Sequence, residues 1–136
     1  MKYSFIQSVK SDYLRLKKRL SGARILFNYS FILCFWYRVC HSLSNNQKPI
    51  SKIILIFPYL IYSVTRLLTG IQLPHRTKVG KGLCFLHYSC IVIAQDTIIG
   101  NNCSIHQGVT LGRSFAGDKA GCPIIGNNVI IFPGLK

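Results

Sequence analysis

The sequence predicts an α+β protein in which a helical N-terminal region, residues 1–70, is followed by a solenoid of short strands, residues 71–136. Two observations lead to this prediction. The first half of the chain contains apolar runs and a basic segment at helical spacing, whereas the second half places an aliphatic or aromatic residue every six positions. A chain of 136 residues is long enough for one modest core, so a second independent core is not expected.

The charge balance excludes several kinds of chemistry. The chain has 17 Lys and Arg against three acids, Asp12, Asp96 and Asp118, and a formal net charge of +14. Three carboxylates argue against paired-carboxylate catalysis and against a carboxylate-rich metal site. Most of the excess lies in residues 1–70, so we expect an anionic partner. Nucleic acid is not expected, because no recognition motif and no aromatic–basic interleaving are present.

The six cysteines suggest a reducing environment. No C-x-x-C pair occurs, and the first twenty residues lack the apolar core of a secretory signal. The cysteines and the four histidines show no metal-ligand spacing, so no metal is expected. We therefore expect a cytoplasmic protein, with the inner face of the membrane as an alternative location.

Residues 3–20 are expected to form a basic amphipathic helix. Phe5, Val9, Tyr13 and Leu16 fall on one helical stripe, and the lysines lie largely elsewhere. Such a helix can pack on its own domain, or it can make peripheral contact with an anionic membrane or a partner. The sequence leaves both alternatives open.

Two apolar runs, residues 25–37 and 53–65, are expected to form further helices. Each has 13 residues between charges, which is short of the roughly 20 needed to cross a bilayer. Pro58 is expected to kink or split the second helix, and Gly70 is a plausible C-cap for it. Buried or interfacial helices fit these runs better than membrane spans.

The second half of the chain carries the strongest signal, a six-residue repeat. Val, Ile, Leu or Phe falls at nine repeat positions: Val79, Phe85, Ile91, Ile93, Ile99, Ile105, Leu111, Ile125 and Ile131. This period suits short strands and tight turns with one core residue per strand. The recurring segments Gly100–Asn102 and Gly126–Asn128 are expected to be turns with left-handed backbone angles. Residues 113–121 (RSFAGDKAG) interrupt the repeat as a flexible extension.

The stretch VGKGLCFLHYSCIVIAQDTIIGNNCSIHQGVTLG, followed by CPIIGNNVIIFPG, resembles the hexapeptide-repeat acyltransferases. It is most similar to the serine O-acetyltransferase group and its polysaccharide-modifying relatives, over roughly residues 70–136. The resemblance implies a left-handed parallel β-helix that forms homotrimers, with acetyl-CoA bound as co-substrate between neighbouring coils of two subunits. It implies transfer of an acetyl group to a hydroxyl of L-serine or of a sugar. The alternative is a non-catalytic β-helix module that docks on an anionic membrane or a partner protein.

The resemblance also implies roles for individual residues. His87 matches the family's catalytic histidine and is the candidate general base. A hydroxyl is a poor nucleophile while it keeps its proton, so a base is needed for its oxygen to attack a thioester. Gln72 stands where the family has an aspartate that orients this histidine. The coenzyme A site is expected to include two segments and one lysine from the extension: Gly112–Arg113, Pro133–Gly134 and Lys119. His106 is expected to be a coil-surface residue without a role.

Three departures from the family pattern concern the acceptor and the end of the chain. Leu86 replaces an acidic residue before the base, and Cys122 replaces a second family histidine. The two lost acids, at Gln72 and Leu86, would have favoured the ammonium group of serine, so the sequence leaves serine and sugar open. Residues 131–136 still follow the repeat, so we expect a truncated member of the family with an incomplete cofactor site.

Overall fold

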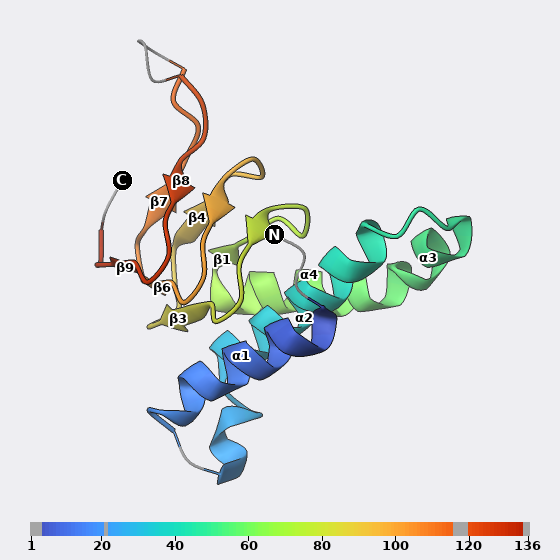
Figure 1. Ribbon diagram of the computed structural model, residues 1–136, viewed down its shortest axis with the longest axis horizontal. Helices are drawn as coiled ribbons and strands as arrows, with labels where there is room; N and C mark the ends of the chain where they lie inside the picture. Colours follow the sequence, from blue (N-terminus) through green and yellow to red (C-terminus); the bar gives the residue numbers. More distant parts are fainter. Residues whose placement is uncertain (1–3, 21, 116–119, 135–136) are drawn as a thin grey trace.

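The computed structural model describes residues 4–20, 22–115 and 120–134. Helices form the first part of the chain, and a three-sided stack of short parallel strands forms the second (Figure 1). The last helix ends at Thr69 and the first strand begins at Ile71. Gly70 joins them as a left-handed C-cap with a φ of 65°, as the sequence predicts.

Within residues 4–20 and 22–70, the helical region contains four α-helices and one short 3₁₀ helix, and local capping chemistry marks the starts of two of these helices. Ser4 and Gln7 form a capping box at the start of the first helix, and the Asn28 side chain caps the third helical element. Pro58 lies in the first turn of the last helix, where its missing N–H is not needed. The elements are α1 (Phe5–Lys17), η1 (Gly22–Ile25), α2 (Tyr29–Ser44), α3 (Pro49–Ile54) and α4 (Ile56–Thr69).

The first helix differs from its sequence prediction. The residues that α1 buries are Ser8, Asp12 and Leu16, whereas Phe5 remains 38% exposed. Of the four residues of the expected stripe, Leu16 is buried, whereas Phe5, Val9 and Tyr13 line an open apolar groove. The stripe therefore packs on the protein only at Leu16 and in part at Tyr13, and hydrophobicity alone did not predict the polar contacts that the inner face of α1 makes with the β-helix.

The strands stack in three parallel sheets, one for each side of the β-helix. The sheet orders are β1-β4-β7, β2-β5-β8 and β3-β6-β9, so every third strand returns to the same side. Their bounds are β1 (Ile71–Gln72), β2 (Lys78–Val79), β3 (Cys84–Leu86), β4 (Ile91–Ile93), β5 (Ile98–Ile99), β6 (Ser104–His106), β7 (Thr110–Leu111), β8 (Ile124–Ile125) and β9 (Ile130–Ile131).

The core confirms the six-residue repeat. Seven of the nine repeat positions are buried, and the other two, Val79 and Ile125, pack against them. The asparagine turns are confirmed as well, because Asn102 and Asn128 have φ values of 57° and 59°. Their side chains form a ladder between coils, with Asn102 Nδ2 donating to Asn128 Oδ1 at 3.2 Å. The helix α2 and Tyr62 of α4 join the same core, so the two regions pack as one unit.

Register shows where the repeat is interrupted. Ile71 pairs with Ile91, a spacing of 20 residues, whereas Val92 pairs with Thr110, a spacing of 18. The extra two residues lie in the turn at residues 87–90, because the matching turn one coil later has only residues 107–108. A larger extension follows β7, where Ser114 and Gly121 form an antiparallel bridge at its base. The expected interruption at residues 113–121 is therefore confirmed.

Candidate active site

The enlarged turn between β3 and β4 holds His87 in an unusual backbone conformation. His87, Ser89 and Cys90 have φ values of 59°, 153° and 49°, a region that residues with a side chain rarely adopt. Neighbouring segments hold the turn in place: Gly108 N donates to Ser89 O at 3.0 Å, and the Tyr88 ring lies 4.7 Å from that of Tyr29. Strained backbone of this kind persists only where surrounding contacts fix it, and it concentrates at functional sites.

The His87 side chain is exposed at this corner, with a second imidazole beside it. The ring centroids of His87 and His106 are 6.2 Å apart, and His106 stacks on Phe132 at 5.6 Å. His106 pairs in register with Leu86, so the three rings form a column along one corner of the β-helix. His106 is therefore part of the candidate site, which the sequence prediction missed. The 20-residue coil spacing was the signal that could have found it.

Gln72 lies in β1, one coil before β4, and its side chain is exposed. In the described part of the chain, no hydrogen bond joins Gln72 to His87. Gln72 instead lines a shallow hollow of about 470 Å³ together with Ser63, Arg66 and Leu67 of α4. The orienting role of Gln72 therefore stays a prediction.

The expected cofactor residues fall at two different corners. Gly134 lies at the His87 corner, where its N–H donates to Gln107 O at 3.3 Å, and Pro133 precedes it. Gly112 and Arg113 follow β7 and so lie at the opposite end of the same sheet. Lys119 lies outside the described residues. One chain thus brings His87 together with Pro133 and Gly134, but not with Gly112 and Arg113.

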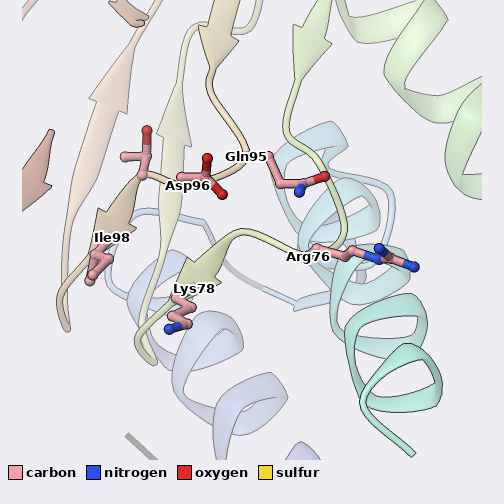
Figure 2. Close-up of a pocket in the computed structure, with 6 residues that line it drawn as sticks. Arg76, Lys78, Gln95, Asp96 and Ile98 are labelled. Carbon is pink, nitrogen blue, oxygen red and sulfur yellow. The ribbon is translucent and has the colours of Figure 1, made fainter. Parts of the chain in front are cut away.

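The Arg113 corner is basic. Arg113 pairs with Asp96 at 3.4 Å, and Asp96 lines a hollow of about 160 Å³ with Arg76 and Lys78 (Figure 2). A neighbouring hollow of about 500 Å³ also contains Arg76 and Lys78 and extends to His41 at the end of α2. Three basic side chains at one corner suit a phosphate-bearing ligand. Arg76 and Lys78 were not among the sequence candidates, although Arg76 lies one 20-residue coil before Asp96.

Curated proteins similar to this chain are serine acetyltransferases, whereas no protein-family model matches it. The chain is 32% identical to that of Synechococcus elongatus over 117 residues, which cover 85% of this chain and 46% of the relative. It is 30% identical to that of Staphylococcus xylosus over 139 residues, which cover 98% of this chain and 62% of the relative. The chain thus spans about half the length of the curated relatives it matches.

Solved structures agree with these relatives. Soybean serine acetyltransferase complexed with serine has a TM-score of 0.77 and 25% identity, and covers 96% of this chain and 54% of its own. A serine acetyltransferase in complex with CoA has a TM-score of 0.73 and 26% identity, and covers 96% of this chain and 53% of its own. The predicted fold, a helical region before a left-handed parallel β-helix, is confirmed. The chain is a hexapeptide-repeat protein of the serine O-acetyltransferase-like type.

Proposed function

We propose that this protein is an acetyl-CoA-dependent O-acetyltransferase with His87 as its general base. The observation that carries the proposal is the exposed imidazole at the enlarged, strained turn. The similarity to a serine acetyltransferase in complex with CoA supports acetyl-CoA as the donor.

In this mechanism His87 takes the proton of the acceptor hydroxyl as its oxygen attacks the thioester carbonyl. The carbonyl π electrons move to oxygen, and backbone N–H groups are suited to stabilise the resulting oxyanion. Collapse of this intermediate breaks the carbon–sulfur bond. The coenzyme A thiolate leaves and takes a proton from the His87 imidazolium, so the base returns to its starting state.

We propose that the phosphates of the donor bind at the basic corner formed by Arg76, Lys78 and Arg113. Guanidinium and ammonium groups are the usual partners of phosphate. Because the base and this corner lie at opposite ends of one sheet, a site shared between neighbouring subunits would bring them together. A homotrimer is the proposed assembly, and a trimeric mass in analytical ultracentrifugation would support it, whereas a monomer with full activity would contradict it.

L-Serine is the first candidate acceptor, since curated relatives and solved structures that resemble this chain are serine acetyltransferases. A sugar hydroxyl is the second, and the surroundings of His87 favour it. Among the described residues, Asp12 is buried against Arg38 and Asp96 pairs with Arg113, so neither acid faces the His87 corner. Within the described residues of one chain, an amino-acid ammonium would therefore find no carboxylate partner at the His87 corner, whereas a neutral sugar needs none.

Thiol release from acetyl-CoA, measured with serine and a panel of sugars, tests the proposal. We expect acceptor-dependent release with one acceptor class. If no acceptor causes thiol release, the alternative of a non-catalytic β-helix module is favoured, whether or not the protein binds acetyl-CoA. A cytoplasmic location is proposed with this function, since all six cysteines are free thiols, which suits a reducing compartment.

A further inference from the structure

The α3–α4 segment exposes its apolar side and buries its polar side. Six large apolar residues form two rows with seven-residue spacing, and all are more than half exposed: Ile50, Phe57 and Val64, and Ile53, Leu60 and Leu67. We name these six residues the apolar stripe. Leu67, the most exposed, has 83% of its surface accessible. A stripe of this size and order is unusual on a surface that meets only water.

The buried side of the segment explains why the stripe is not turned inward. Ser51, Tyr62, Thr65 and Thr69 face the protein. The Tyr62 hydroxyl donates to Leu73 O, and the Thr69 hydroxyl donates to Thr65 O at 2.8 Å. The Thr69 bond lies within α4, whereas the Tyr62 bond to the residue after β1 and the packing of Tyr62 in the core shared with α2 fix the rotation of α4. The stripe is therefore presented outward by a firmly packed helix.

The segment Pro49–Thr69 has 21 residues, is long enough to cross a membrane and has a mean hydropathy of 1.4 in its most apolar window. Crossing would require Tyr62 to leave the core and its partner Leu73 O and to enter lipid with an unpaired hydroxyl, which is costly, although Thr65 and Thr69 keep their partners within the helix. A helix that keeps one side on its own domain can instead lie in the plane of the interface. The packing thus favours lying on a membrane over spanning it.

The positive charge around the apolar stripe indicates what kind of surface the stripe contacts. No acidic residue occurs between Asp12 and Asp96, and Lys48 and Lys52 are exposed at the N-terminal end of the stripe. Residues 1–70 carry eleven bases and one acid, so a second copy of this chain would present the same sign of charge. An anionic lipid surface offers both an apolar phase and the opposite charge.

We propose that the apolar stripe docks in the interface of an anionic lipid bilayer, with the α3–α4 axis parallel to the membrane plane. The six side chains enter the boundary between headgroups and acyl chains, while Lys48 and Lys52 remain at the headgroup level. None of the stripe residues lies at the His87 corner or the Arg113 corner, although Leu67 lines the hollow that also contains Gln72.

Vesicle flotation tests the proposal with the purified protein. The vesicles are phosphatidylcholine alone, or phosphatidylcholine mixed with phosphatidylglycerol. The double variant Phe57→Ser/Leu67→Ser removes two stripe residues, and Leu26→Ser/Phe27→Ser removes a matched exposed pair near η1. Unchanged circular dichroism and melting temperature verify that both variants fold.

We expect the unmodified protein to float with the anionic vesicles, and added salt to weaken this binding. The stripe variant should bind at least about tenfold more weakly, and the control variant within about twofold of the unmodified protein. Absence of flotation would overturn the proposal, as would equal loss in the control variant. Equal binding to uncharged vesicles would refute the anionic preference. A stripe variant that dissociates to smaller species without any change in lipid binding would assign the stripe to contact between copies.

Discussion

Arg38 and Asp12 form a buried ion pair that fastens the helices to the first coil of the β-helix, with Arg38 Nε 3.0 Å from Asp12 Oδ2. Asp12 Oδ1 also accepts from the backbone N–H groups of Gly82 and Leu83 at 2.8 and 2.9 Å. Arg38 in turn donates to the carbonyl oxygens of Val79 and Gly80. Both charges are therefore fully hydrogen-bonded, and the turn that precedes β3 is positioned by α1 and α2.

Replacing Asp12 with Asn should strongly destabilise the fold. The change leaves the Arg38 charge buried without its anion and turns the Asn Nδ2 donor toward the Arg38 guanidinium, while the amide oxygen can still accept from the two backbone N–H groups. Loss of one partner of a buried pair costs about 3–5 kcal/mol in the free energy of unfolding. Urea denaturation measures this loss.

The exposed pair of Arg113 and Asp96, at 3.4 Å, provides the control. Asp96→Asn should change the free energy of unfolding by less than about 1 kcal/mol, because solvent screens exposed pairs. Similar losses in Asp12→Asn and Asp96→Asn would contradict the role given to the buried pair.

His41 should make stability depend on pH. Burial lowers the pKa of His41, the nearby Arg38 charge lowers it further, and only the backbone contact with His75 opposes this shift. His41 Nδ1 lies 2.8 Å from His75 O, and Asn45 Nδ2 lies 2.9 Å from His41 Nε2. Since a carbonyl oxygen only accepts, Nδ1 carries the proton and Nε2 accepts from Asn45, so the neutral ring is fully satisfied.

The sign of the effect follows from proton binding. Below about pH 6.5, the ordinary pKa of histidine, the unfolded chain takes up a proton that folded His41 resists. Stability should therefore fall as the pH drops from about 6.5 toward the lowered pKa, and level off below it. Melting temperatures measured across this range, with His41→Gln as the comparison, check the prediction. An equally steep fall in the His41→Gln variant would assign the pH dependence to another group.

Gly100 is expected to tolerate no side chain. A Cβ there would lie 2.4 Å from Gly126 O and 2.6 Å from Gly126 C, and both are backbone atoms of the next coil. Gly100→Ala should therefore cost about 1–3 kcal/mol or more, because stacked coils cannot separate locally. Gly126→Ala is the matched control, since nothing lies within 4 Å of its Cβ position. A melting temperature lowered equally by both substitutions would contradict the close approach.

The fold was largely predictable because its determinants are local. Each repeat residue such as Ile99 or Ile105 specifies its own strand, and Asn102 specifies its own turn. The contacts between the two regions were not predictable in this way. The partners of Asp12 are Arg38 and the backbone near Gly82, far along the chain, and no periodicity records such a pairing.

The candidate site was predictable only in part. The motif around His87 predicted a general base at this position, but coil length decides which residues lie beside it. Two extra residues in the turn at 87–90 shift the register, so His106 lies one coil above Leu86 and its ring approaches His87. The sequence also did not predict which side of α4 is exposed, because a hydrophobic run does not reveal which of its faces packs on α2.

Gln72→Asp should change the pH dependence of catalysis if Gln72 orients the base. A carboxylate beside the imidazole stabilises its protonated form, so the acid limb of the pH–rate profile should move to higher pH. Gln72→Glu tests whether the longer side chain retains the effect. A folded Gln72→Asp variant with an unmoved profile would show that this residue does not act on His87.

The most direct test of the proposed function is the turnover number of the His87→Asn variant in the thiol-release assay, at saturating acetyl-CoA and acceptor. Asn keeps a polar side chain and tolerates the left-handed backbone at this turn, so the fold should be preserved. If His87 is the general base, turnover should fall by about 10²–10⁴-fold while acetyl-CoA binding stays nearly unchanged. Turnover equal to that of the unmodified protein would contradict the assignment of His87 as the base.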